Sequence, residues 1–355
     1  MHRKSFFHVI PTLAIGVLML VASQAKAQDD KFDPKKLPPI NAAQARLEQT
    51  FKGLDGPGFA IVAKRDASLV AAACDRNTIQ MWSKDVLFGI RDGDSSANVL
   101  KGHQGTVTDL AWNGGPVLAS SGADKKIVLW ALNTGKIANT IDPGELVREL
   151  AMSPDGKLLA SAGDNNNIRL WDVASGKAVR ELKGHTDWVT CLAFTSDSKQ
   201  LVSGGYDGKG ILWDVASGKN IRYLAPPTPP KKKEDPLVVV IVSSVTISFD
   251  GKIIALGRVN GEIDLVSPAN GKTTRTLKGH TSRVTALKFH PTGTVLASSS
   301  KDGSLRLWNP ANGGLFKELK DHKAWVQDVS FLSDWTRLAT VGADRTVRVW
   351  NLTNP

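Results

Sequence analysis

The chain has 355 residues, of which 41% are hydrophobic and 22% charged, so its composition excludes a mainly disordered protein. Its 2 cysteines are too few for a disulfide scaffold or a cysteine-rich zinc module. The formal net charge of +11 raises nucleic acid as a possible partner. Tryptophan is far more frequent than tyrosine, with 10 Trp against 2 Tyr.

The first 27 residues predict a secretory signal peptide. Arg3 and Lys4 precede an apolar run at 9–23, and Ala-Lys-Ala at 25–27 fits a cleavage site. The run is short for a membrane span, so an uncleaved anchor is the weaker alternative. Loss of residues 1–27 removes three basic residues and no acid, which lowers the net charge to +8. We therefore expect export to the periplasm or beyond, no nucleic-acid partner, and no integral membrane span after cleavage.

Residues 28–44 are predicted to be a flexible leader, because they contain the run Asp-Pro-Lys-Lys-Leu-Pro-Pro. Beyond them, residues 45–355 repeat with a period of about 42 residues. Trp171 lies in IRLWDVASGK, and Trp213 lies in GILWDVASGK 42 residues further on. One unit has Val in the Trp position. With this unit included there are seven, and their reference residues are Trp82, Trp130, Trp171, Trp213, Val266, Trp308 and Trp350.

Other polar residues recur in register with the tryptophan. A His precedes it by 27 or 28 residues, a Ser or Thr by ten and an Asp by six. Four units carry the complete set: His103, Ser120, Asp124 and Trp130; His185, Ser203, Asp207 and Trp213; His280, Ser298, Asp302 and Trp308; and His322, Thr340, Asp344 and Trp350. Asp-Gly and Ser-Gly-Lys turns between short β-rich runs predict hairpins, and four short strands per period are typical of a propeller blade.

These motifs resemble the WD-repeat (WD-40) β-propeller family, in a secreted bacterial-type member. The resemblance implies an all-β fold, a seven-bladed β-propeller of four-stranded antiparallel blades. Only five residues follow Trp350, too few for the last strand of the seventh blade. Residues 45–53 align with the AVRELKG strand at 178–184. We expect them to form the N-terminal strand that closes the last blade, as is common in the family.

The recurring His, Ser and Asp raise the question of a hydrolase triad. A triad needs one exposed nucleophile at a unique site, whereas this set occurs four times and includes an indole N–H, which only donates hydrogen bonds. The resemblance implies a buried structural hydrogen-bond network instead. We therefore predict no catalytic residues and no enzyme activity. Blades 1 and 5 lack the set, with Ala72 and Leu256 in the Ser position, and are expected to rely on packing alone.

The positions that vary between repeats are the candidates for partner binding. In this family, binding sites usually lie on the face formed by the loops that carry the His and Asp residues. Alignment of the repeats places large aromatic or basic residues there: Trp188, Tyr206, Arg283, Lys301 and Trp325. Trp, Tyr and Arg are enriched at binding hot spots. We therefore predict a non-catalytic scaffold that binds a protein or peptide on this His-loop face, as a monomer or within a hetero-complex.

Three further features leave alternatives open. The insertion at 225–236 (APPTPPKKKEDP) is either a docking arm or a tolerated surface loop. No phosphate loop or metal-spaced cluster is visible, so we expect no cofactor and no metal. The alternative function is an enzyme, or a small-molecule or glycan binder, at the channel mouth. His290 in FHPTG is expected to be an exposed turn residue.

Overall fold

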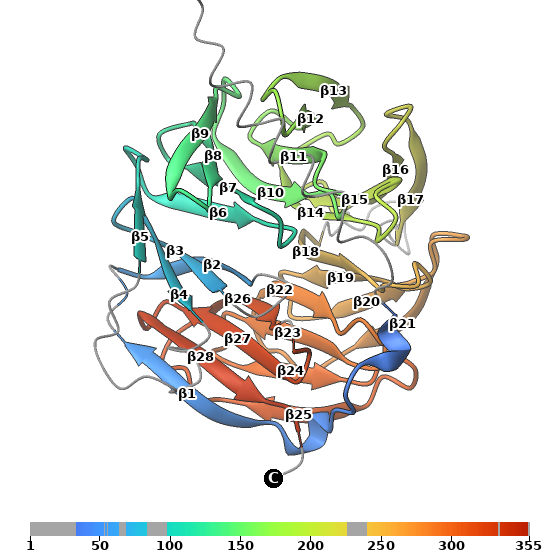
Figure 1. The fold of residues 1–355 in the computed structure, drawn as a ribbon. Coiled ribbons are helices and arrows are strands. Elements are labelled where there is room, and N and C mark those ends of the chain that lie inside the picture. The colour runs from blue at the N-terminus through green and yellow to red at the C-terminus, as the bar shows by residue number, and fades with distance from the viewer. Residues whose placement is uncertain are drawn as a thin grey trace, which may run out of the picture. The chain divides into compact units, whose positions relative to one another are not determined.

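The computed structural model describes residues 33–52, 54, 56–63, 69–83, 98–225, 240–332 and 334–353 (Figure 1). The chain divides into two units, Met1–Asp33 and Pro34–Pro355. The proposed signal peptide at 1–27 lies outside the described residues, as do residues 28–32 of the proposed leader. Of the insertion at 225–236, only Ala225 is described.

The second unit is built of seven four-stranded antiparallel sheets, which confirms the predicted seven-bladed propeller. Blade 1 is β2 (Gly58–Ala63), β3 (Leu69–Cys74), β4 (Thr78–Ser83) and β5 (Asn98–Lys101). Blade 2 is β6 (Val107–Ala111), β7 (Val117–Gly122), β8 (Ile127–Ala131) and β9 (Lys136–Ile141). Blade 3 is β10 (Val147–Met152), β11 (Leu158–Gly163), β12 (Ile168–Asp172) and β13 (Ala178–Leu182). Blade 4 is β14 (Val189–Phe194), β15 (Gln200–Gly205), β16 (Gly210–Asp214) and β17 (Asn220–Leu224).

The remaining blades follow the same order. Blade 5 is β18 (Val242–Ile247), β19 (Ile254–Arg258), β20 (Ile263–Val266) and β21 (Thr273–Leu277). Blade 6 is β22 (Val284–Phe289), β23 (Leu296–Ser300), β24 (Leu305–Trp308) and β25 (Leu315–Leu319). Blade 7 is β26 (Val326–Phe331), β27 (Arg337–Gly342), β28 (Thr346–Asn351) and β1 (Arg46–Lys52). Each innermost strand contacts the innermost strand of the next blade, and β26 contacts β2, so the seven blades close into a ring (Figure 1).

The ring is closed by a strand from the other end of the sequence, as predicted. β1 pairs antiparallel with β28, and Thr50 lies opposite Arg348. An ion pair between Glu48 and Arg337 reinforces this seam, and together with Asp334 it holds the pKa of Arg337 above its usual value. β1 covers the outer edge of β28 and is the fourth strand of blade 7.

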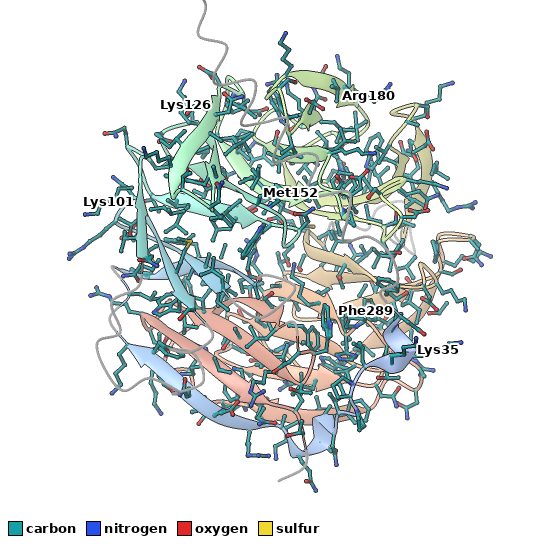
Figure 2. All side chains as sticks on the ribbon, in the orientation of Figure 1. Lys35, Lys101, Lys126, Met152, Arg180 and Phe289 are labelled. Atoms are coloured by element: carbon teal, nitrogen blue, oxygen red, sulfur yellow. The ribbon has the colours of Figure 1, made fainter. Side chains whose placement is uncertain are left out.

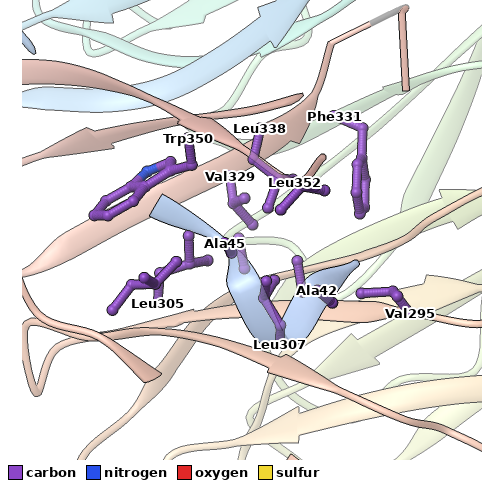
Figure 3. Packing of buried hydrophobic residues seen from close by; sticks show 13 residues of the cluster. Ala42, Ala45, Val295, Leu305, Leu307, Val329, Phe331, Leu338, Trp350 and Leu352 are labelled. Carbon is purple, nitrogen blue, oxygen red and sulfur yellow. The ribbon is translucent and has the colours of Figure 1, made fainter. Parts of the chain in front are cut away.

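The end of the segment expected to be a flexible leader is packed. It contains two short 3-10 helices, η1 (Pro34–Lys36) and η2 (Ala42–Gln44). The Asn41 N–H donates to the Leu352 carbonyl at 2.7 Å. Ala42 and Ala45 are buried in the apolar cluster between blades 6 and 7 (Figure 3). Their small side chains fit against Leu307 of β24, a fit that composition alone does not reveal.

The core lies between the faces of adjacent blades. Strands at the second and third positions of each blade are almost entirely buried, as in β7, β11 and β28. Figure 3 shows one such interface, where Leu305 and Leu307 of blade 6 pack near Leu338 and Trp350 of blade 7. Burial of a Leu side chain contributes about 1.5–3 kcal/mol. Charged side chains such as Lys101, Lys126 and Arg180 lie at the outer rim (Figure 2).

His290 is buried, and the expectation of an exposed turn residue is wrong. Its Nδ1 lies 2.7 Å from Thr292 Oγ1 and its Nε2 lies 3.0 Å from the Trp335 carbonyl oxygen. The ring also contacts Phe331 of blade 7, at 5.2 Å between centroids. The turn that carries His290 is covered by the neighbouring blade, and burial lowers the pKa of the imidazole.

Candidate functional site

The His-loop face is formed by the connections that enter the innermost strands and by the turns between the second and third strands. In blade 4 the first connection, between β13 and β14, carries His185, and the turn between β15 and β16 carries Asp207. Antiparallel pairing brings both to the same end of the blade. This arrangement places the recurring polar residues of each blade side by side.

The His, Ser or Thr, Asp and Trp of one blade form a continuous hydrogen-bonded set, called the tetrad below. In blade 4, His185 Nδ1 lies 3.0 Å from the Asp207 carboxylate and Nε2 lies 2.7 Å from Ser203 Oγ. Trp213 Nε1 donates to the same Ser203 oxygen at 2.8 Å. The same contacts, within 2.7–3.1 Å, join the residues numbered 103, 120, 124 and 130; 280, 298, 302 and 308; and 322, 340, 344 and 350.

The tetrad aspartates are stabilised in their ionised form. Burial alone would raise the pKa of Asp302, but hydrogen bonds from His280 and Ser304 outweigh it and hold the pKa well below its usual value. The carboxylate also accepts the Thr281 backbone N–H at 3.1 Å. The His and the Ser or Thr side chains of the tetrads are buried, and they face each other and the Trp ring. The tetrads therefore present no exposed nucleophile.

Blade 5 replaces the tetrad with a buried arginine, so the expectation that it relies on packing alone is wrong. Arg258 forms an ion pair with Asp264 at 3.0 Å. Its guanidinium donates to the carbonyl oxygens of Gly208, Ala225 and Val240 at 3.0, 3.2 and 2.9 Å. It therefore joins Gly208 and Ala225 of blade 4 to Val240, which precedes β18. A basic residue in an otherwise apolar strand was the available sequence signal.

Blades 3 and 1 differ again. In blade 3, Trp171 Nε1 still donates to Ser161 Oγ at 2.8 Å, and the Glu145 carboxylate accepts the Asn165 N–H at 2.9 Å in place of a His–Asp pair. In blade 1, Leu54, Ala72 and Trp82 are buried in the apolar contact with blade 7.

Two of the five predicted surface residues meet on blade 4. The rings of Trp188 and Tyr206 lie 5.4 Å apart in an edge-to-face arrangement, and the Tyr206 N–H donates to the Trp188 carbonyl at 2.8 Å. Trp188 is 38% exposed. The Arg148 guanidinium of blade 3, which sequence reasoning missed, lies 4.4 Å from the Trp188 ring centroid and pairs with Asp164. Cation–π contact of this kind fixes the orientation of an exposed indole.

The other three lie on blades 6 and 7. Lys301 Nζ lies 4.1 Å from the ring centroid of Trp325, which is 49% exposed. The Lys301 N–H donates to the Arg283 carbonyl at 3.0 Å. The structure thus forms two aromatic–cation groups, Arg148–Trp188–Tyr206 and Arg283–Lys301–Trp325, with blade 5 between them in chain order.

Both groups border one cavity of about 690 Å³ at the centre of the ring, because Arg148, Tyr206, Arg283 and Lys301 all line it. Three carboxyl groups also line it, from Asp109, Glu149 and Asp328, which the sequence analysis did not predict. These acids share one repeat position, two residues after the Val that begins the innermost strand. That shared position was a usable signal.

The three acids join adjacent blades. Asp109 accepts the Leu150 N–H at 2.6 Å and Asp328 accepts the Ile61 N–H at 2.8 Å. Burial in the channel raises the pKa of Asp109 to about 7 and raises that of Glu149 well above its usual value. These hydrogen bonds continue around the ring in other blades as hydroxyl contacts, such as Thr285 Oγ1 to the Val326 carbonyl at 2.6 Å.

Within the described part of the chain, no group of three or more His, Cys, Asp or Glu side chains is arranged to hold a metal ion. Among the same residues, no helix has both the length and the apolar character needed to span a membrane.

A closed ring of four-stranded blades, pinned by recurrent His–Ser–Asp–Trp tetrads, defines a repeat β-propeller. The family model described as "WD domain, G-beta repeat" matches residues 95–131, 137–172, 176–214, 271–309 and 313–351, together more than half of the chain. The protein therefore belongs to the WD40 family. The matched segments contain the first three strands of blades 2, 3, 4, 6 and 7. The two unmatched blades, 1 and 5, are those that lack the His, the Ser or Thr and the Asp of the tetrad. A search of the curated proteins found no match.

Proposed function

We propose that this protein is an exported, non-catalytic scaffold that binds a protein or peptide partner on its His-loop face. Members of the WD40 family commonly serve as protein-interaction scaffolds, and the described fold is of that kind. The proposed contact residues are Trp188, Tyr206, Arg283, Lys301 and Trp325.

One observation carries the proposal. Two half-exposed tryptophans on this face are each held by a cation at the rim of a single cavity. Large, oriented aromatic surfaces bordered by basic groups contribute strongly to binding energy, because they lose little conformational entropy on association. The tetrads support this role indirectly, since they fix the loops that carry the aromatic residues.

The alternative is an enzyme or small-molecule binder that uses the channel mouth. A carboxyl group with a pKa near 7 in a cavity favours it, because such groups are frequent in active sites. We place it second because Asp109 and Asp328 each accept a backbone N–H of the neighbouring blade, which gives them a structural role. Native mass spectrometry of the purified protein would reveal a retained small molecule and favour this alternative.

Crosslinking in the native cell-envelope fraction tests the main proposal. The Trp188→Ala/Trp325→Ala double variant is expected to lose partners that the wild-type protein captures. Ile137→Ala/Val179→Ala is the matched control, because both residues are exposed apolar side chains on outer strands. Identical capture by the wild type and a folded Trp188→Ala/Trp325→Ala variant would refute the proposed surface.

Export is a separate part of the proposal. It is supported by the basic start, the apolar run and the Ala-Lys-Ala site in residues 1–27. Mass spectrometry of the protein from its native host is expected to find a mature N-terminus at Gln28. An N-terminus at Met1 in all the cellular protein would contradict cleavage.

A further inference from the structure

The cavity rim carries two neighbouring cations that lack a carboxylate partner among the described residues. Neither Arg283 nor Lys301 takes part in an ion pair formed by those residues. Burial, and next the positive charge of Arg283, lower the pKa of Lys301. Of the two other basic side chains that line the cavity, Arg148 is paired with Asp164, and Lys288 interacts electrostatically with Asp109 and Asp328. Arg283 and Lys301 therefore place two positive charges side by side on blade 6.

The nearest acid in sequence does not neutralise this pair. Asp302 follows Lys301 directly, but its carboxylate lies 2.8 Å from His280 Nδ1 and accepts hydrogen bonds from the Thr281 and Ser304 N–H groups at 3.1 and 2.9 Å. The tetrad thus turns this carboxylate into the blade and leaves Arg283 and Lys301 available to a partner.

An apolar surface adjoins the two cations. Trp325 lies beneath Lys301 Nζ and is 49% exposed, while Tyr206 lines the same cavity. A ligand that places a carboxylate between Arg283 and Lys301 would therefore have an indole face beside it. Two close cations and an aromatic side chain are complementary to an acidic residue next to an apolar one.

We propose that the partner bound here is an acidic peptide segment, with a carboxylate held by Arg283 and Lys301 and a neighbouring apolar side chain against Trp325. This inference rests on the proposed function, since it specifies the chemistry of the ligand at the same face. A peptide fits better than an anionic polysaccharide, because Arg283 and Lys301 line a concave cavity that also presents the Tyr206 ring.

Fluorescence anisotropy of the full chain with defined probes tests the proposal. The probes are a short fluorescein-labelled peptide of Glu, Leu and Gly, and the same peptide with Gln in place of Glu. The acidic probe is expected to bind about tenfold more tightly than the Gln probe, with a difference that shrinks as salt is added. Arg283→Glu/Lys301→Glu is expected to lose this preference and to favour a Lys-containing analogue of the probe.

Two controls keep the outcome specific. Lys199→Glu/Lys272→Glu makes the same charge reversal in exposed turns at the other end of the blades and is expected to bind like the wild type. The milder Arg283→Gln/Lys301→Gln variant, with an unchanged melting temperature, shows that any loss is not due to unfolding. Equal or undetectable binding of both probes to the wild type, or stronger competition by heparin than by the acidic peptide, would overturn the proposal.

The proposed function can survive this failure. Partner capture that depends on Trp188 and Trp325 but is unaffected by Arg283→Glu/Lys301→Glu would refute only the acidic peptide and leave the binding face in place. Capture unaffected by either double variant would refute both.

Discussion

At the scale of single residues, the tetrad aspartate has the most contacts to lose. Asp302 is hydrogen-bonded to His280, to Ser304 and to two backbone N–H groups, so it connects the loop before β22 to the turn between β23 and β24. Sequence spacing identified these residues because they recur in phase. It did not identify the blade-joining acids, which occur in only some blades and resemble ordinary polar strand residues.

Asp302→Ala is expected to destabilise the protein by about 1–3 kcal/mol, because a buried His280 loses its partner. Urea denaturation at pH 7 measures the change. The exposed Asp321→Ala is the control and is expected to change stability by less than about 0.5 kcal/mol. Equal stabilities for the two variants would contradict a structural role for the tetrad.

Asp109 makes the stability of the folded protein depend on pH. Its pKa in the folded protein is about 7, above the ordinary value of 3.8, so the folded state retains its proton longer. Its contribution to stability is therefore complete below about pH 4 and is lost as the pH rises to about 7. Asp109→Asn cannot ionise but keeps an oxygen that accepts the Leu150 N–H.

We expect Asp109→Asn to match the wild type at pH 4 and to be more stable at pH 8 by about 1–2 kcal/mol, with water in the channel limiting the gain. Denaturation at both pH values measures this difference. Asp109→Ala, which lacks the acceptor, is the control and is expected to be less stable than Asp109→Asn at both. A wild type and Asn variant of equal stability at pH 8 would show that Asp109 ionises without penalty.

At the scale of elements, blade 5 shows how one buried side chain can replace a tetrad. Val266 occupies its reference tryptophan position, and no His precedes its innermost strand. In their place, β19 ends in Arg258, which binds three carbonyl oxygens and Asp264. The residues for this arrangement were visible in the sequence. That these residues lie close together in space could not be predicted, because Gly208, Ala225 and Val240 are far apart along the chain.

Arg258→Met is expected to cost about 3 kcal/mol, because it leaves the buried Asp264 and the carbonyl oxygens without a donor. Hydrogen exchange should show the largest loss of protection in β18 and β19. Arg275→Met, at an exposed site on β21 of the same blade, is the control and should leave stability nearly unchanged. Similar hydrogen exchange in both variants would contradict a stabilising role for the Arg258 contacts.

At the scale of the whole described unit, closure depends on β1. This strand covers the outer edge of β28 and is linked to β27 through the Glu48–Arg337 pair. Without it, β28 would present unpaired N–H and C=O groups to other molecules. The alignment of residues 45–53 with the AVRELKG strand at 178–184, together with the family resemblance, predicted this closure.

Deletion of residues 28–53 is expected to cause aggregation and a lower melting temperature. Light scattering and thermal denaturation test this. A chain that begins at residue 34 is the control and should stay soluble, because it retains η2 and β1. A soluble monomer with an unchanged melting temperature after the longer deletion would refute a role for β1 in closure.

The sequence by itself determined the seven-bladed fold, the tetrad residues and the closing strand, because each depends on spacing along the chain and on strand chemistry that repeats. Only the tertiary structure decided the burial of His290, the packing of Ala42 and Ala45, the Arg258 contacts and the meeting of Arg148 with Trp188. These contacts join different blades, and their partners are set by the curvature and closure of the ring, which no single repeat encodes.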